Sequence, residues 1–337
     1  MSPLDRIHGG PDVLGVPRYD FSTNANACGP CHVVLEAVGA ADPTVYPDAS
    51  YADLKQKLAV FHGVDVRRIL LAASASEFIF RITAWHAGQG AGPVGLPLHS
   101  YGDYAAAAAA NRLPVVAGNA GGAGLRWACD PSSPVGAADE HLAALAPAPG
   151  RPVVLDRAYE PLRLNGELAL SLQALQAYWQ LWTPNKALGL TGIRAAYAIA
   201  PVDAGVDVDA VNQLCPSWPV GAHGVAMLQA WTQPTTQAWL QESLERLRQW
   251  KHRQLTICQA MSWDCLPSMA NFFCARPALP QGLTLQQALA QLRTEGIKLR
   301  DTASFGLPGH VRLSVLSPRA QDALQAAWQH ITGKATT

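Results

Sequence analysis

The chain has 337 residues, of which 49% are hydrophobic and 15% are charged, and this length is enough for a large core and two domains. Its formal net charge is zero, which argues against a nucleic-acid-binding protein and against an acidic tail. The first residues hold no apolar signal core, and no stretch reaches the roughly 18 apolar residues of a membrane span. We therefore expect a cytoplasmic protein that binds neither nucleic acid nor membrane.

Seven scattered cysteines, an odd number, are typical of reduced thiols. The pair Cys28-Gly-Pro-Cys31 has the spacing of a thioredoxin-type redox site, which requires a strand before the pair and a helix after it. A polar segment, residues 20–27, precedes the pair here, so a redox role is disfavoured. A zinc site is disfavoured as well, because no second Cys/His pair follows at the required spacing.

Apolar runs alternate with helical segments over the first 200 residues. Residues 51–62 place Leu54, Leu58 and Phe61 on one helical face. We expect further helices at 77–86, 104–110 and 172–178, and strands at 69–73, 94–98, 113–116, 153–155, 181–183 and 195–200. This alternation predicts an α/β core with a mostly parallel sheet.

The pattern changes after Pro201. Helices are expected at 224–231, 236–258, 285–295 and 321–331, with strands at 265–275 and 311–315. These elements indicate a smaller α+β domain, and we place the hinge between the two domains near residues 232–250.

Two residues that could do chemistry follow expected strands, where ligands of open α/β sheets bind. Asp156 ends the run Pro-Val-Val-Leu-Asp, and Lys186 comes shortly after the next strand. Asp156 could instead cap a helix, and Lys186 could be a solvated loop lysine. Lysine is scarce in this chain, however, and Gly189-Leu-Thr-Gly192 beside Lys186 indicates a close backbone approach.

A lysine held among apolar groups is more readily a free amine, because burial penalises the charged form, and it can then attack a carbonyl carbon. Thr183, Asn185 and Arg194 offer donors that suit a dianionic phosphate. A carbonyl and a phosphate on one ligand suggest pyridoxal phosphate, whose ring nitrogen needs a carboxylate such as Asp156.

These motifs resemble those of class I/II pyridoxal-phosphate aminotransferases of fold type I. The similarity is to the branch that contains histidinol-phosphate aminotransferase and threonine-phosphate decarboxylase. It rests on Thr183-Pro-Asn-Lys186 with Gly189-Leu-Thr-Gly-Ile-Arg194-Ala-Ala-Tyr197, on Asp156-Arg-Ala-Tyr159, on Asn24-Ala-Asn26-Ala-Cys-Gly29, and on Tyr46-Pro-Asp48. It runs from about His8 to the last helix.

The resemblance implies an architecture as well as a chemistry. It implies a mostly parallel seven-stranded sheet with helices on both faces, plus a smaller α+β C-terminal domain. Residues 1–40 would be an N-terminal arm packing with the small domain, residues 41–235 the large cofactor-binding domain, and residues 236–337 the small domain. A homodimer with a shared active site would follow, since Tyr46 would contact the phosphate of the partner subunit's cofactor.

The resemblance also implies residue roles. Lys186 would bond to the cofactor aldehyde and later move the Cα proton, with Asp156 on the ring nitrogen and Tyr159 on the phenolic oxygen. The other expected cofactor contacts are Tyr101 on the ring face, Ser133 near the phenolic oxygen, and Ala75, Ser76, Thr183, Asn185 and Arg194 around the phosphate. Arg312 would bind the substrate carboxylate, and Asn26 and His8 would contact the substrate. Tyr101, Tyr159 and Arg312 could each also be ordinary packing or surface residues.

The sequence departs from the family pattern in the loops around the expected cofactor. Ala72-Ala-Ser-Ala-Ser76 replaces a glycine-containing loop, and alanine does not readily adopt positive φ. Ser133 stands where the family has an asparagine. We expect an aminotransferase acting on an amino acid or a phosphorylated amino compound. A threonine-phosphate decarboxylase-like enzyme of cobalamin synthesis, and a cofactor-binding protein that has lost turnover, remain the alternatives.

Overall fold

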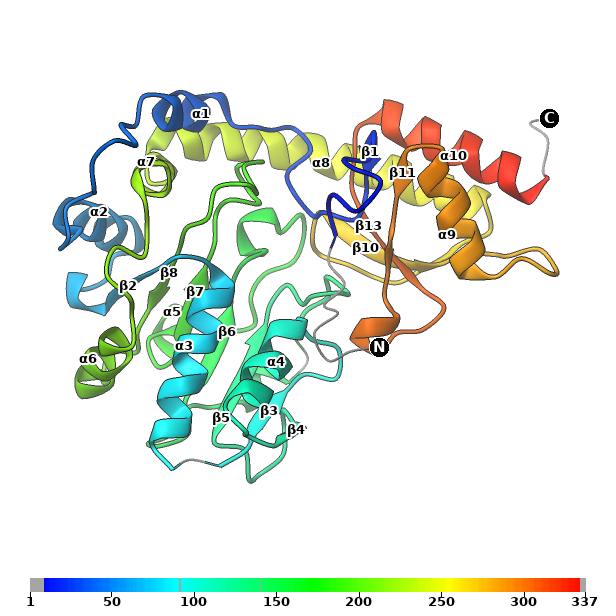
Figure 1. Cartoon of the computed structure of the whole chain (residues 1–337). Helices are drawn as coiled ribbons and strands as arrows, with labels where there is room; N and C mark the ends of the chain where they lie inside the picture. Colours follow the sequence, from blue (N-terminus) through cyan, green and yellow to red (C-terminus); the bar gives the residue numbers. More distant parts are fainter. Residues whose placement is uncertain (1–8, 91, 140, 334–337) are drawn as a thin grey trace.

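A computed structural model describes residues 9–90, 92–139 and 141–333. The chain forms a larger α/β part and a smaller α+β part, shown side by side in Figure 1. The long helix α8 (Pro234–Ala260) runs along both. Its first half lies near α1 and α7, and its second half contacts α10 and β9. The expected hinge region, residues 232–250, therefore falls largely within a continuous helix.

The larger part is built on a seven-stranded sheet with the order β2-β8-β7-β6-β5-β3-β4. The strands are β2 (Ile69–Ala72), β3 (Val94–Leu96), β4 (Val115–Ala117), β5 (Leu125–Cys129), β6 (Val153–Asp156), β7 (Trp179–Trp182) and β8 (Ala196–Ile199). Strand β8 is antiparallel to both of its neighbours, and the other pairs are parallel. The expectation of a mostly parallel seven-stranded sheet is confirmed.

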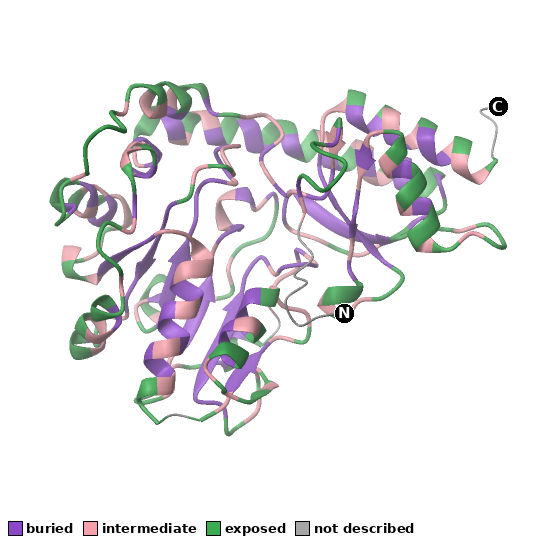
Figure 2. Cartoon of the chain, viewed as in Figure 1, coloured by how far each residue is buried: buried purple, intermediate pink, exposed green. Residues whose placement is uncertain are grey.

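Helices cover both faces of this sheet because successive strand residues point to opposite sides. On β6, Val154 packs toward the cluster of α3 and α4, whereas Val153 and Leu155 pack toward α5. The helices are α1 (His32–Gly39), α2 (Ala52–His62), α3 (Ala75–Gly88), α4 (Gly102–Ala110), α5 (Leu172–Leu175), α6 (Gly205–Gln213) and α7 (Ala222–Trp231). Figure 2 shows the strands of this sheet as largely buried, and the edge strand β4 is the exposed one among them.

The smaller part is an antiparallel sheet with the order β12-β13-β10-β9, covered by two helices. Its elements are β9 (Asp264–Cys265), β10 (Phe272–Arg276), α9 (Leu285–Thr294), β12 (Arg300–Asp301), β13 (Val311–Ser314) and α10 (Pro318–Thr332). Near the N-terminus, β1 (Tyr19–Asp20) pairs with β11 (Ile297–Lys298) of this part. Helix α1, in contrast, packs against α7 of the larger part.

Most of the expected elements lie within a few residues of their expected positions. The helix expected at 172–178 is a single turn, α5, because the chain turns at 176–178 to enter β7, and the strand expected at 265–275 is divided into β9 and β10. The elements that were not expected include strands β1, β5, β11 and β12 and helices α1 and α6. Within the described residues, no helix combines the length and the apolar character that crossing a membrane requires. The domain limits 1–40, 41–235 and 236–337 stay a prediction.

Candidate active site

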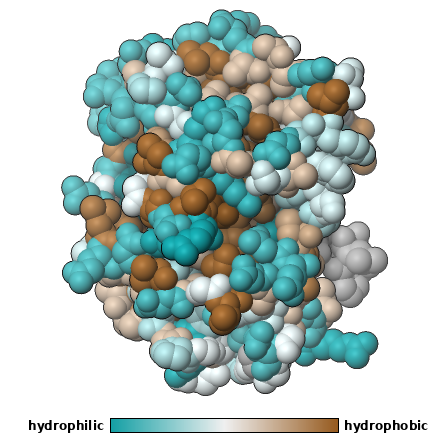
Figure 3. All heavy atoms as spheres, turned by 90° about the vertical axis from the view of Figure 1, so that its left-hand side faces the viewer, coloured by the Kyte–Doolittle hydropathy of each residue, from teal (hydrophilic) through white to brown (hydrophobic). Residues whose placement is uncertain are grey.

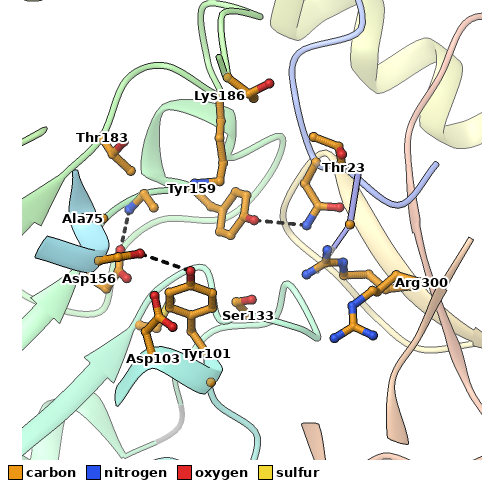
Figure 4. Close-up of a pocket in the computed structure, with 18 of the residues that line it drawn as sticks. Thr23, Ala75, Tyr101, Asp103, Ser133, Asp156, Tyr159, Thr183, Lys186 and Arg300 are labelled. Atoms are coloured by element: carbon orange, nitrogen blue, oxygen red, sulfur yellow. Dashed lines mark hydrogen bonds between the residues drawn. The ribbon is translucent and has the colours of Figure 1, made fainter. Parts of the chain in front are cut away.

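A cavity of about 420 Å³ opens at the carboxyl ends of β5, β6 and β7, where the smaller part meets the central sheet. Asp156 reaches it from the end of β6 and Lys186 from the turn after β7, while Arg300 and Arg312 line it from the small sheet. This volume is in the usual range for a small-molecule or cofactor site. Figure 4 shows Lys186 and Tyr159 next to each other, with Asp156 and Tyr101 on one side and Arg300 across the cavity.

Asp156 is a buried carboxylate with two hydrogen-bond donors. Its Oδ2 accepts from the Tyr104 hydroxyl at 2.7 Å, and its Oδ1 accepts from the Ala158 amide at 2.9 Å. Burial raises the pKa of this carboxyl, although Tyr104, the Ala158 amide and the charge of Lys186 act in the opposite direction. No helix starts at Asp156, so its alternative role as a helix cap does not apply.

Lys186 stands in a tight turn that the neighbouring backbone holds in place. Gly189 has φ +69°, and a Cβ there would lie 3.0 Å from the Cα of Gly29, which explains why a glycine is needed. The amide of Asn26 donates to the Lys186 carbonyl at 2.8 Å. The lysine side chain points into the cavity, and its Nζ lies 5.4 Å from the centroid of the Tyr159 ring.

Three tyrosines surround this centre. The hydroxyl oxygen of Tyr159 accepts a hydrogen bond from Asn24 Nδ2 at 3.2 Å. Tyr101, at the start of α4, lies with its hydroxyl 3.3 Å from Ser76 Oγ, and burial raises its pKa to about 12. Tyr104 packs edge-on against Tyr101 and holds Asp156. The cavity thus has phenol groups beside both its carboxylate and its amine.

The N-terminus of helix α3, which also borders the cavity, is suited to bind an anion. Helix α3 begins at Ala75, and Ser74 caps it by accepting from the Glu77 amide at 3.1 Å. Free amides at the first turn and the helix dipole favour negative charge there. Ser74 is extended, with φ −169°, and no residue from 72 to 76 has positive φ, so the alanine-containing loop makes this turn without a glycine.

Thr183, Asn185 and Arg194 also line the cavity. The Asn185 side chain is largely engaged within the protein. Its Oδ1 accepts from Thr183 Oγ1 at 2.9 Å, and its Nδ2 donates to the carbonyls of Thr191 and Ile193 at 3.4 and 3.3 Å. It therefore ties the segment that carries Arg194 to the segment that carries Lys186.

Two arginines paired across β12 and β13 form the far wall of the cavity. Arg312 donates to the Ser22 carbonyl at 2.9 Å, and its buried Nε has no hydrogen-bond partner among the described residues. Burial, followed by the charge of Arg312, lowers the pKa of Arg300 to about 10. The Phe305 ring lies 4.8 Å from the Arg300 guanidinium carbon and 5.7 Å from that of Arg312.

The structure brings most of the expected site residues together. Those that line the cavity are Ala75, Ser76, Tyr101, Ser133, Asp156, Tyr159, Thr183, Asn185, Lys186, Arg194 and Arg312. Tyr46 lies on the surface with 77% of its area exposed, away from this cavity. His8 lies outside the described residues.

The expected substrate contact of Asn26 stays a prediction. Its side chain does not line the cavity, because its Nδ2 donates to Ala187 O and Ser243 Oγ at 3.0 and 2.7 Å. Asn24, two residues earlier in the same motif, lines the cavity instead. Sequence reasoning also missed Tyr104 and Arg300. The signal for Tyr104 was the spacing Tyr101-x-x-Tyr104 at the start of a helix. The signal for Arg300 was a second arginine near Arg312, on what proves to be the neighbouring strand.

The cysteine pair does not have the environment of a redox site. Burial raises the pKa of both the Cys28 and the Cys31 thiol, which disfavours the reactive thiolate. Cys28 Sγ lies 3.7 Å from the Ser243 carbonyl, to which it donates. The pair thus packs the N-terminal segment against α8.

The residues of the cavity fit pyridoxal phosphate. A buried carboxylate and an amine face one space, a half-buried tyrosine lies beside them, and a helix N-terminus with a nearby arginine suits a phosphate. Asn24 Oδ1 and Arg312 Nε are buried polar atoms without a partner among the described residues, as expected in a site built around a polar ligand.

Comparison with known proteins agrees with this geometry. The family model for aminotransferase class I and II matches residues 124–331. The chain belongs to this family. The expectation of a pyridoxal-phosphate-dependent aminotransferase with the type I fold is confirmed.

Similar proteins and structures come mostly from one group of enzymes. Histidinol-phosphate aminotransferase 1 from Thiobacillus denitrificans is 28% identical over 90% of this chain and 83% of its own length. The Jannaschia histidinol-phosphate aminotransferase is 26% identical over 91% of this chain and 89% of its own. The solved histidinol-phosphate aminotransferase of Sinorhizobium meliloti, in complex with pyridoxal-5'-phosphate, has a TM-score of 0.81 at 22% identity and covers 99% of this chain and 97% of its own. L-threonine-O-3-phosphate decarboxylase from Porphyromonas gingivalis has a TM-score of 0.73 at 19% identity, covering 93% and 97%.

Proposed function

We propose that this aminotransferase acts on a phosphorylated amino compound similar to histidinol phosphate. The observation that carries the proposal is the Arg300–Arg312 pair, two arginines in register on neighbouring strands that line the same cavity. Two adjacent guanidinium groups favour a strongly anionic substrate group such as a phosphate. The similarity to histidinol-phosphate aminotransferases supports the same substrate class.

We further propose the site assignment that the cavity geometry supports. Asp156 would hold the ring nitrogen of the cofactor, Tyr159 and Ser133 its phenolic oxygen, Tyr101 the ring face, and Ala75, Ser76, Thr183, Asn185 and Arg194 its phosphate. When bound at Lys186, pyridoxal phosphate supplies an electron sink for negative charge at the substrate Cα.

The chain's own groups would then bind the substrate and move its protons. The Lys186 amine, which points into the cavity, would take a proton from the substrate Cα and return one to the atom next to it. Because Asn24 Nδ2 donates to Tyr159, the phenol keeps its own proton free to donate into the cavity. Arg300 and Arg312 would orient the anionic end of the substrate.

The test is a product assay with the purified holoenzyme and candidate substrates. With histidinol phosphate as the amino donor and 2-oxoglutarate as the acceptor, we expect glutamate to form without release of carbon dioxide. Carbon dioxide released from threonine phosphate would instead support the decarboxylase of cobalamin synthesis. If neither product forms and the cofactor absorbance is unchanged by every donor, the protein has lost turnover and the proposal fails.

We also propose that the enzyme works as a homodimer in the cytoplasm, with Tyr46 contributing to the partner's cofactor site. Figure 3 shows apolar side chains gathered on the face that carries α1, α2 and α7. The exposed apolar residues in this region, which we call the apolar face, are Leu35, Val45, Tyr46, Val60, Leu214 and Trp218. Clustered exposed apolar groups favour association. All seven cysteines are free thiols, which suits a reducing compartment.

A further inference from the structure

A hydrogen bond joins two segments of the chain that border the cavity from its two sides. His99 lies in the loop between β3 and α4 of the larger part, and Phe305 ends the short 3₁₀ helix η4 (Ala303–Phe305) of the smaller part. His99 Nδ1 is 2.9 Å from the Phe305 carbonyl oxygen. The residues lie 206 positions apart in the chain, so this bond joins segments that no short connection holds together.

Both ends of this bond continue directly into the cavity lining. Tyr101 follows His99 by two residues and lines the cavity. On the other side, Ser304 Oγ accepts from the Arg300 Nη2 at 2.8 Å, and the Phe305 ring contacts the guanidinium groups of Arg300 and Arg312. The bond from His99 to the Phe305 carbonyl therefore also restrains the side chains of Ser304 and Phe305 that contact the two arginines.

The direction of the bond follows from its chemistry. A carbonyl oxygen can only accept, so His99 Nδ1 must carry the proton and donate it. Both the neutral Nδ1–H form and the protonated ring meet this requirement. The space beside the ring is shared with Gly306, where a Cβ would lie 3.6 Å from His99 Nδ1 and where φ is +76°. The segment can thus turn back beneath the histidine only with glycine following Phe305.

We propose that His99 is a positioning residue for substrate binding, which fastens the segment of residues 303–309 over the cavity and thereby holds Arg300 and Phe305 ready for the anionic group. This inference rests on the proposed function for its substrate, but not for the bond itself. His99 is not among the residues that line the cavity. Its loss should weaken substrate binding by leaving the arginine wall less ordered, because binding must then order that segment.

The test compares His99→Phe, which keeps a flat ring but cannot donate, with His99→Asn, whose side-chain amide can donate to the same carbonyl. A matched control is Leu98→Ala, at an adjacent residue that is 90% exposed. In the holoenzyme, we expect His99→Phe to raise KM for the phosphorylated amino donor by about fivefold with kcat nearly unchanged, as for the loss of one hydrogen bond. His99→Asn should recover most of this effect, and Leu98→Ala should leave KM unchanged.

Hydrogen exchange gives a readout that does not depend on turnover. The amides of Gly306 and Leu307 donate to Ala303 and Thr302 at 3.0 and 3.2 Å, and they should exchange faster in His99→Phe but not in His99→Asn. Unchanged exchange and unchanged KM in His99→Phe would overturn the inference, and so would a fall in kcat alone or a failure of His99→Asn to restore KM. If exchange is faster in His99→Phe but the enzyme turns over no phosphorylated donor, the proposed function is overturned, whereas the role of His99 in holding residues 303–309 is supported.

Discussion

Asp156 depends on a single phenol for the support of its Oδ2 oxygen, and this dependence can be measured. In Tyr104→Phe the buried carboxylate loses the 2.7 Å bond from Tyr104 and keeps only the Ala158 amide. A buried hydrogen bond to a charged group contributes about 1.5–3 kcal/mol, so we expect pyridoxal phosphate to bind roughly tenfold or more weakly. Fluorescence titration of the apoprotein with the cofactor measures this change.

The matched control for this prediction is Tyr178→Phe. Tyr178 is also buried, but its hydroxyl contacts the Leu142 carbonyl at 3.5 Å in the cluster around α5, away from the cavity. Its removal should leave the cofactor dissociation constant unchanged. Equal losses in both variants would mean that Tyr104 acts through general packing rather than through Asp156.

His62 makes the stability of the protein sensitive to acid. Burial, followed by the charge of Arg157, lowers the pKa of His62 to about 3 from a usual value of 6.5, and its Nε2 lies 2.8 Å from the Tyr197 hydroxyl. Between these pH values the unfolded chain binds a proton that the folded protein excludes. The free energy of unfolding should therefore fall as pH drops below 6.5, by up to about 1.4 kcal/mol per pH unit from this residue.

Replacing His62 with glutamine removes this titration and leaves an amide near Tyr197. Urea unfolding between pH 7 and 4.5 should show a shallower loss of stability in His62→Gln than in the wild type. Tyr197→Phe removes the same hydrogen bond but retains the histidine, so its stability should follow the wild-type slope from a lower starting value. A slope in His62→Gln that matches the wild type would contradict the assignment.

At the scale of elements, the start of α3 contributes to the stability of the protein and also forms part of the expected phosphate site. The Ser74 hydroxyl satisfies the Glu77 amide at the first turn, so Ser74→Ala should lower the free energy of unfolding by about 1 kcal/mol. Because the same turn presents Ala75 and Ser76 to the cavity, cofactor affinity should fall as well. Chemical denaturation and cofactor titration measure the two effects.

Ser171→Ala is the matched control for Ser74→Ala. Ser171 caps the one-turn helix α5 in the same way, because its hydroxyl oxygen accepts a hydrogen bond from the Ala174 amide at 3.1 Å. Ser171 is exposed and far from the cavity lining. Ser171→Ala should cost less stability and leave cofactor affinity unchanged. A similar loss of affinity in the two variants would separate the α3 N-terminus from phosphate binding.

Which elements could be predicted from sequence depended on how cleanly each run matched one period. Strands β2 and β8 are unbroken apolar runs, β6 is an apolar run that ends at Asp156, and all three were expected within a residue or two. Strand β5 was missed because Arg126 interrupts its apolar run. In the structure Arg126 is 9% exposed, and its guanidinium group donates to the Ala146 carbonyl. The long side chain thus lets a charged residue occupy an interior strand, because its charged end finds a hydrogen-bond partner beyond the strand.

The candidate site was predictable where its residues follow strands in a recognisable order, as Asp156 and Lys186 do. Both asparagines of the motif, Asn24 and Asn26, are polar and buried, and only the fold shows that Asn24 lines the cavity. Arg300 escaped notice because its partner, Arg312, lies 12 residues away on the neighbouring strand. Strand register, which brings the two together, cannot be read from either segment alone.

At the scale of the whole molecule, the cavity is assembled from both parts of the chain, and the connections between them are spread out. Helix α8 spans the two parts, and its Lys251 donates to the carbonyls of Ser268 and Ala270 at 2.6 and 2.8 Å. The N-terminal segment adds a further link, since Ser22 accepts from Arg312 while Asn24 donates to Tyr159. Several independent contacts therefore hold the side of the cavity that carries Asp156 and Lys186 against the side that carries Arg300 and Arg312.

The apolar face carries a stacked pair of aromatic rings. Tyr46 stacks on Trp218 with ring centroids 4.6 Å apart, and the Trp218 indole donates to the Pro47 carbonyl at 3.1 Å, so these rings form one ordered, exposed platform. Aromatic residues at the centre of an interface often carry much of its binding energy. We expect Trp218→Ala to shift the chain from dimer to monomer at micromolar concentration in sedimentation velocity runs.

Activity should fall together with association, because the proposal places Tyr46 in the partner's site. Tyr46→Phe should leave the dimer intact yet weaken cofactor binding, since it removes only the hydroxyl that would reach the phosphate. Val13→Ser, at a fully exposed residue in the turn near α9, is the control and should change neither property. A wild-type chain that sediments as a fully active monomer would refute the shared site, because Tyr46 is too exposed and too far from its own cavity to act there alone.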